Sequence, residues 1–230
     1  EAFQKAIRSL ETGRYGLGHA KDFDSKSKEE LLKMLITPTS ERHFVMYEAL
    51  RKGATVDEIH ELTKVKHWFI EQMKELVEEE EALLKSKGSL PSDELLITAK
   101  KDGFSDKYLS QILEIPEEDV RNHRIQLGVE EAWEGVHVSG TENSAYYYST
   151  YNAEDKNPVN EEKPKIMILG GGPNRIKQRI EFDYCCVHAS LALKKLGFET
   201  IIVNCNPETV STDYDTSDKL YFEPLTLEDV

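Results

Sequence analysis

The hydrophobic pattern of this chain changes period near residue 130, and that change limits the folds it can adopt. Before it, apolar residues recur at intervals of three and four, which is the spacing of amphipathic helices. After residue 164, the pattern is a short apolar run, a glycine-rich turn, a helical segment and a second apolar run. We therefore predict an α plus α/β chain, in which a helical region precedes a Rossmann-like βαβ unit.

The helical region divides into short helices with recognisable ends. Two capping boxes, Ser27 with Glu30 and Thr55 with Glu58, mark helix starts because each side chain can bond the backbone amide of the other residue. Short connections predict one compact bundle over residues 20–130. The predicted helices cover residues 1–12, 27–36, 40–53, 55–64, 67–87, 92–102, 105–113 and 116–127.

The longest of these helices carries both an apolar stripe and an acidic run. Phe69, Met73, Leu76 and Val77 are expected to face the core. The four glutamates at 78–81 are expected to lie on a solvated face, because charged side chains are seldom buried without partners.

Residues 128–160 are expected to be a mostly irregular, exposed connector. Tyr146, Tyr147, Tyr148 and Tyr151 interleave there with small residues. Tyrosines on such a segment usually pack their rings on a neighbouring domain and leave the hydroxyl in water.

The α/β region reads as one βαβ unit. Residues 165–169 suit a strand buried on both faces of a parallel sheet, and the triple glycine at 170–172 suits the following turn. A helix at 180–196 and a second strand at 200–204 complete the unit. Four helix residues are expected to face inward: Tyr184, Val187, Leu191 and Leu193.

A triple glycine before a helix weakly suggests phosphate binding. The dinucleotide fingerprint needs glycines at G-x-G-x-x-G spacing, and counting from Gly170 puts the third position on Arg175. A nicotinamide-dependent oxidoreductase is therefore the enzyme alternative, and the spacing disfavours it.

The charge of the chain argues against nucleic-acid binding. Its formal net charge is −14 and no basic stripe is present. Residues 53–76 have the layout of a helix-turn-helix, which gives a binding-module alternative. Its second helix carries Glu71, Glu75, Glu78 and Glu79, which would repel phosphates.

Composition also predicts the compartment. No apolar run reaches the roughly 18 residues of a membrane-spanning helix, and the first residues show no secretory signal pattern. Cys185, Cys186 and Cys205 lack the spacing of a disulfide framework or a zinc site, so we expect buried, reduced thiols and a cytoplasmic location.

Several stretches of the sequence are more distinctive than a βαβ unit by itself requires. They are GGGPNRI at 170–176, IEFDYCCVHA at 180–189, VNCNPETVSTDYDTSD at 203–218, LYFEP at 220–224 and YSTY at 148–151. These residues resemble the start of the second half of the carbamoyl-phosphate synthetase large subunit, and the upstream region resembles its oligomerisation domain.

The resemblance implies a domain assignment for an internal piece of that subunit. Residues 1–19 would be the last helix of the first synthetase half, 20–135 the helical oligomerisation domain, and 136–163 a connector. Residues 164–230 would be a truncated pre-ATP-grasp α/β domain of the second half.

The resemblance also implies an activity for the parent enzyme, an ATP-dependent carbon–nitrogen ligase. It would make carbamoyl phosphate from bicarbonate, ammonia released from glutamine by a small amidotransferase subunit, and two ATP with Mg²⁺ or Mn²⁺. The catalytic ATP-grasp residues would lie outside this chain, so we expect no catalytic, cofactor or metal residue here and no activity of the chain alone. Other large subunits would bind through the helical domain. Arginine and pyrimidine synthesis are both compatible as pathways.

In the family, the small α/β domains help to line a tunnel that carries carbamate between active sites. By resemblance, Arg175, Arg179, Glu181 and Glu208 match tunnel-lining positions. An ion pair between the glutamates and Arg175, or a capping role, is the structural alternative. The family has Gly-Gln-Gly where this chain has Lys177, Gln178 and Arg179, and two long cations there would fill space that glycines leave open.

Overall fold

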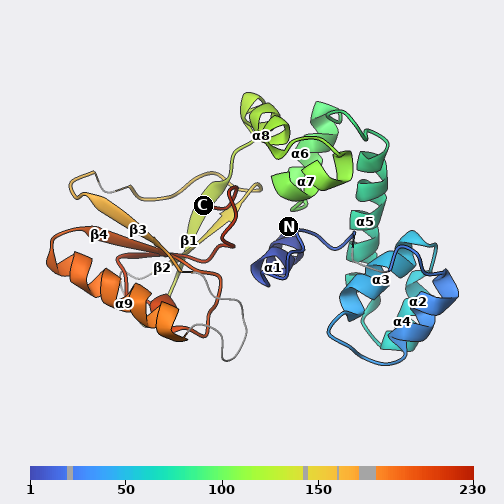
Figure 1. Ribbon diagram of the computed structural model, residues 1–230, viewed down its shortest axis with the longest axis horizontal. Coiled ribbons are helices and arrows are strands. Elements are labelled where there is room, and N and C mark those ends of the chain that lie inside the picture. Colours follow the sequence, from blue (N-terminus) through green and yellow to red (C-terminus); the bar gives the residue numbers. More distant parts are fainter. Residues whose placement is uncertain (20–22, 142–144, 160, 171–179) are drawn as a thin grey trace. The chain divides into compact units, whose positions relative to one another are not determined.

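The computed structural model describes residues 1–19, 23–141, 145–159, 161–170 and 180–230 (Figure 1), with the side chains of 180–182 left out. It divides the chain into two compact units. The helical unit spans Arg14–Leu127, and the sheet unit combines Glu1–Gly13 with Gly128–Val230. An α plus α/β chain is confirmed.

The helical unit contains seven of the described helices, and two of them start at the predicted capping boxes. Both capping boxes form: Ser27 and Thr55 each accept the amide of the third helical residue, and Glu30 and Glu58 accept in return. The helices are α2 (Lys28–Leu35), α3 (Arg42–Arg51), α4 (Val56–Thr63), α5 (His67–Leu84), α6 (Asp93–Lys101), α7 (Asp106–Leu113) and α8 (Glu117–Gln126).

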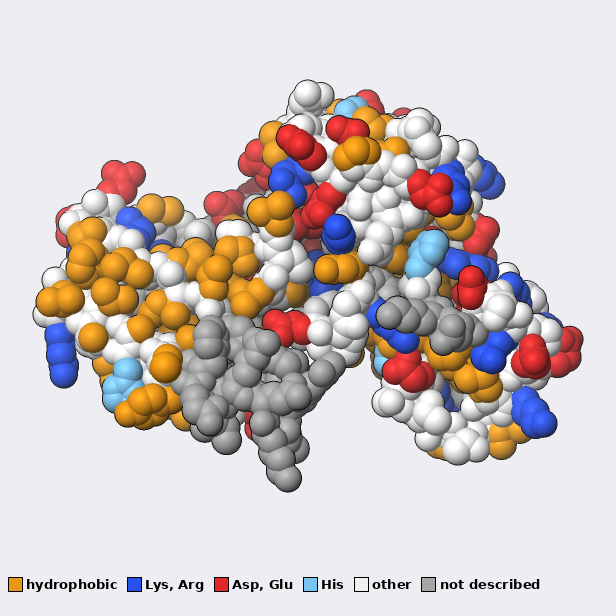
Figure 2. All heavy atoms as spheres, in the orientation of Figure 1, with side chains coloured by type: hydrophobic (Ala, Val, Ile, Leu, Met, Phe, Trp, Pro, Cys, Tyr) orange, Lys and Arg blue, Asp and Glu red, His pale blue; other side chains and the backbone are white. Residues whose placement is uncertain are grey.

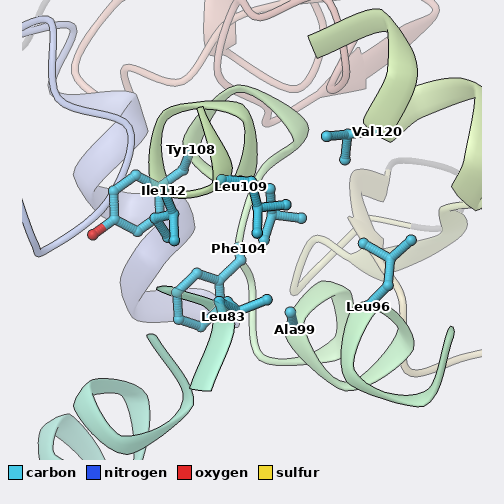
Figure 3. Close-up of a cluster of buried hydrophobic side chains, with 9 residues drawn as sticks. Leu83, Leu96, Ala99, Phe104, Tyr108, Leu109, Ile112 and Val120 are labelled. Atoms are coloured by element: carbon cyan, nitrogen blue, oxygen red, sulfur yellow. The ribbon is translucent and has the colours of Figure 1, made fainter. Parts of the chain in front are cut away.

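Helix α5 joins the parts of this unit. It packs against α3 and α4 and also against α7. The second half of the unit has an apolar core built by α5, α6, α7 and α8, whose side chains are drawn in Figure 3. Its buried members are Leu83, Leu96, Ala99, Phe104, Tyr108, Leu109, Ile112, Leu113 and Val120.

Two predictions about α5 are wrong. Phe69 is 55% exposed, whereas its neighbour Ile70 is fully buried, so the buried stripe is displaced by one residue at the start of the helix. Glu80, from the run assigned to a solvated face, is 0% exposed. Periodicity does not reveal that partners on other helices can neutralise a carboxylate and let it enter the core.

The sheet unit contains one mixed five-stranded sheet in the order β1-β2-β5-β4-β3. Its strands are β1 (Ala132–His137), β2 (Ala145–Thr150), β3 (Lys165–Leu169), β4 (Glu199–Val203) and β5 (Lys219–Tyr221). Strands β3, β4 and β5 are parallel, as is the β2–β5 pair, whereas β1 and β2 are antiparallel. The helices α1 (Ala2–Ser9) and α9 (Ile180–Lys195) belong to the same unit.

The expectation of an irregular connector is wrong over β1 and β2. Tyr146, Tyr147 and Tyr148 lie in β2, and Tyr146 and Tyr147 pair with Leu220 and Tyr221 of β5. The tyrosine run is therefore part of the sheet. Sequence reasoning missed it because β5, one of its two partner strands, lies more than 70 residues away, and an aromatic run without clear hydrophobic alternation is weak evidence for a strand.

The βαβ unit is confirmed, but the predicted buried faces are not. Tyr184 and Leu191 of α9 are 63% and 42% exposed, while Cys186 and Ser190 are buried. On β3, Met167 and Leu169 are exposed, so this strand is not covered on both faces. Hydrophobic side chains gather on the sheet unit in the view of Figure 2.

The three cysteines are free thiols, but Cys185 is exposed rather than buried. It precedes Cys186 on a helix, where adjacent residues point in directions about 100° apart, so the two cannot both face the sheet. Burial raises the pKa of the Cys205 thiol to about 11, which keeps it protonated and unreactive.

Candidate functional site

The candidate site lies where the parallel strands β3 and β4 end. Leu169 is in register with Val203, and the amide of Gly170 donates to the Val203 carbonyl at 2.8 Å. A Cβ on Gly170 would stand 3.1 Å from Asn204 Nδ2, closer than most side-chain contacts. Glycine here lets the loops after the two strands begin side by side, at the edge where open α/β sheets place ligand sites.

The loop after β4 is held by side-chain amides. Asn204 is buried; its Oδ1 accepts the Asn206 amide at 3.0 Å, and its Nδ2 donates to Ser211 Oγ at 3.1 Å. Asn206 Oδ1 in turn accepts the amide of Glu208 at 3.0 Å. The turn that carries Glu208 is therefore fixed by bonds from inside its own loop.

The far end of this loop is tied to α9 and β4. Ser190 is buried and donates to the Thr216 carbonyl at 2.8 Å. The Asp218 carboxylate accepts the Thr200 amide at 2.8 Å and the Thr200 hydroxyl at 3.0 Å. A polar loop of this length therefore keeps a defined path, since its backbone groups have internal partners.

The structure describes the four predicted tunnel residues to different extents. Arg175 and Arg179 lie outside the described residues, as does Lys177. Glu181 belongs to the first turn of α9, and its side chain is likewise outside the description. Glu208 is exposed on the turn after β4, and no ion pair of its carboxylate is found among the described residues. The tunnel assignment, and the alternative pairing with Arg175, stay predictions.

A cluster of acidic side chains attaches α1 to the sheet. Lys5 Nζ donates to the carbonyl and hydroxyl of Ser149 at 2.7 and 2.6 Å and pairs with buried Glu223 at 3.0 Å. Arg8 pairs with buried Asp229 at 3.1 Å. The thiol of Cys205 reaches the Ser9 carbonyl at 3.4 Å, so α1 also contacts the loop after β4.

This cluster has more carboxylates than cations. Burial raises the pKa of Glu131 to about 8, and the nearby carboxylates of Asp229, Glu228 and Glu223 add to that effect against the opposing charge of Lys5. Burial is also the first cause of the raised pKa of Glu223. Sequence reasoning missed this group because its members come from three distant segments.

A second buried carboxylate organises the helical unit. Glu80 accepts hydrogen bonds from the hydroxyls of Tyr47 at 2.6 Å and Tyr108 at 2.7 Å, and it pairs with Arg51. Burial, and then the Glu80 charge, raises the pKa of both tyrosines well above its ordinary value, so both remain hydrogen-bond donors. Glu80 thereby connects α3, α5 and α7.

The glycine-rich segment before α2 closes over this carboxylate. The Gly18 amide donates to the Tyr108 hydroxyl at 2.8 Å. A Cβ on Gly18 would stand 2.4 Å from Glu80 Oε1, and one on Gly16 would stand 2.3 Å from the Tyr108 ring. Glycine at these two positions allows the close approach of the backbone to the buried polar group.

In the described part of the chain, no group of three or more His, Cys, Asp or Glu side chains has the arrangement of a metal site. None of its helices is both long and apolar enough to cross a membrane.

Comparison with known proteins gives the family. Residues 1–128 match the model of the carbamoyl-phosphate synthetase large chain, oligomerisation domain, and residues 162–230 match that of the carbamoyl phosphate synthase preATP-grasp domain. The chain belongs to the carbamoyl-phosphate synthetase large-chain family and carries these two domains in that order.

Curated relatives named carbamoyl phosphate synthase large chain align along the whole of this chain. The protein of Nostoc sp. strain PCC 7120 is 49% identical over 233 residues, covering 100% of this chain and 21% of the relative. Those of Neisseria meningitidis serogroup B and Archaeoglobus fulgidus are 50% and 51% identical over 235 and 237 residues, covering 100% of this chain and 21% and 22% of the relatives. The chain thus spans about a fifth of these relatives' length. The oxidoreductase and helix-turn-helix alternatives find no support.

Proposed function

We propose that this chain serves assembly and intermediate transfer within an enzyme that makes carbamoyl phosphate from bicarbonate, glutamine-derived ammonia and two ATP, with Mg²⁺ or Mn²⁺. The observation that carries the proposal is the two-domain match along the chain, at about 50% identity to synthase large chains. The ATP chemistry and its metal ions belong to other parts of such a protein. The cytoplasm is the proposed location, and arginine or pyrimidine synthesis the proposed use.

The helical unit is proposed to bind other large chains, and the whole protein to bind a glutamine amidotransferase subunit. The description of the matching family model as an oligomerisation domain supports the first part. Exposed Ile36, Trp68 and Phe69 on this unit supply apolar surface of the kind that association covers. Sedimentation velocity of the 230-residue chain over a range of concentrations tests self-association. A single monomeric species at every concentration would count against it.

The loops after β3 and β4 are proposed to form part of the wall of a carbamate tunnel through Arg175, Arg179, Glu181 and Glu208. Support comes from the adjacent origin of the two loops at Gly170 and Asn204. A short-lived intermediate needs a route shielded from bulk water. Long cations at Lys177 and Arg179 are proposed to narrow that route.

The tunnel is tested in the full-length protein by the ratio of glutamine hydrolysed to carbamoyl phosphate formed. The Lys177→Gly, Arg179→Gly double variant is expected to lower this ratio by widening the route. Glu208→Ala is expected to raise it by disturbing the wall. Unchanged ratios in both variants would exclude a tunnel role for these positions.

The isolated chain is expected to show no ATP-dependent rise in melting temperature.

A further inference from the structure

We infer that Asp183 is a positioning residue that holds the Glu208 turn against the first turns of α9. The inference rests on the proposed tunnel function. The Asp183 carboxylate accepts hydrogen bonds from the amide of Val210 at 3.1 Å and from the amide of Ser211 at 3.3 Å. These two amides follow Glu208 by two and three residues, so the contact acts directly on the segment that carries the Glu208 side chain.

The contact supplies a cap that the loop does not supply for itself. Val210, Ser211 and Thr212 form a short 3₁₀ helix, and Thr209 at its N-cap makes no side-chain cap bond. The first amides of a helix have no partner within it, and a carboxylate is the strongest acceptor a side chain can offer them. Asp183 performs this capping from a different element, about 27 residues earlier in the chain.

The turn is therefore held on both sides of Glu208. Asn206 binds the Glu208 amide from the preceding side, and Asp183 binds the following amides. The Glu208 side chain itself is exposed between these two attachments. Fixed backbone on either side restricts where the carboxylate can be placed, which is the requirement for a group that lines a narrow route.

Asp183 also joins the two segments that carry predicted tunnel carboxylates. It lies two residues after Glu181 on α9, so the same bond relates the first turns of α9 to the turn of Glu208. The rest of the loop has separate attachments, from Ser190 to Thr216 and from Asp218 to Thr200. Loss of the Asp183 bonds should consequently loosen the Val210 and Ser211 backbone on the following side of Glu208, while the bonds from Asn204 and Asn206, the rest of the loop and the sheet stay in place.

The first experiment measures the contact in the 230-residue chain. Asp183→Ala is expected to raise the hydrogen-exchange rates of the Val210 and Ser211 amides about tenfold or more, because hydrogen bonds to a charged group are among the stronger ones. Asp183→Asn keeps an acceptor oxygen and should give a smaller rise. Asp215→Ala, an exposed aspartate on the same loop, is the matched control and should leave both rates unchanged. Unchanged exchange in Asp183→Ala overturns the inference.

The second experiment measures coupling in the full-length protein. Asp183→Ala is expected to raise the ratio of glutamine hydrolysed to carbamoyl phosphate formed, with partial rescue in Asp183→Asn. A merely structural defect would lower both rates together and leave the ratio unchanged. If Glu208→Ala raises the ratio and Asp183→Ala does not, positioning by Asp183 is wrong. If neither raises it, the tunnel role of Glu208 fails, while the exchange data still decide whether the contact exists.

Discussion

The helical unit and the sheet unit both bury carboxylates, but the two units differ in the number of cations and hydroxyl donors that surround them. In the helical unit, Glu80 has a cation and two hydroxyl donors directed at it. In the sheet unit, Lys5 and Arg8 face the larger set of Glu131, Glu223, Glu228 and Asp229. The partners of Glu80 therefore match its buried carboxylate, whereas the carboxylates around Lys5 and Arg8 outnumber these two cations.

The largest expected effect is the loss of the Glu80 carboxylate. Glu80→Ala leaves Arg51 and the hydroxyls of Tyr47 and Tyr108 without their buried acceptor, so we expect the helical unit to lose about 3–5 kcal/mol of unfolding free energy. Urea titration followed by circular dichroism, with Trp68 fluorescence in a Trp133→Phe background, measures it. Glu78→Ala, an exposed neighbour, should change it by less than about 0.5 kcal/mol. Equal losses would contradict the burial of Glu80.

The stability of the sheet unit should depend on pH through Glu131. A carboxyl whose folded pKa is about 8 binds more protons in the folded than in the unfolded state above its ordinary value of 4.5. Unfolding free energy should therefore fall as pH rises from 4.5 to 8, by at most about 1.4 kcal/mol per pH unit for this one group. Glu131→Gln should flatten that slope and stabilise the unit above pH 8.

Trp133 lies on β1 against Tyr221 and reports on the sheet unit in a Trp68→Phe background. Thermal melts of the parent and of Glu131→Gln at several pH values provide the comparison. Glu134→Gln, an exposed neighbour paired with Lys156, is the control and should keep the parent slope. A slope that persists in Glu131→Gln would place the responsible proton elsewhere.

A smaller loss is expected at Tyr108. Tyr108→Phe keeps the ring in the core but removes the hydroxyl that binds Glu80 and accepts the Gly18 amide, at a cost of about 1–3 kcal/mol. Tyr15 packs on the same core, and no hydrogen bond of its hydroxyl is found in the described part of the chain. Tyr15→Phe should accordingly change stability by less than about 0.5 kcal/mol in the same urea titration.

The smallest effect concerns a helix cap. Ser27→Ala removes the side chain that accepts the Glu30 amide and should destabilise the helical unit by about 1 kcal/mol. The helix predicted over residues 40–53 was expected to open at Thr39 or Ser40, but the N-cap of α3 is Glu41 without a side-chain cap bond. Ser40→Ala should therefore be close to neutral. A loss equal to that of Ser27→Ala would show that Ser40 does cap α3.

The candidate site was only partly predictable. The position of Glu208 after β4 followed from the rule that open α/β sheets place sites at the carboxyl ends of their strands. The predicted glycine-rich turn lies mostly outside the described residues. The roles of Asn204 and Asp183 did not follow, because a capping residue outside the capped segment has no fixed spacing from it.

The sequence by itself determined the features that depend on nearby residues. The order of helices, the capping boxes at Ser27 and Thr55, the strand β3 and the helix α9 all rest on contacts within a few positions. Tertiary structure decided which side of α9 faces the sheet, the pairing of β2 with β5, and the burial of Glu80. Each of these features depends on partners far away in the chain. A local sequence pattern does not indicate which distant residues will pack against a given side chain.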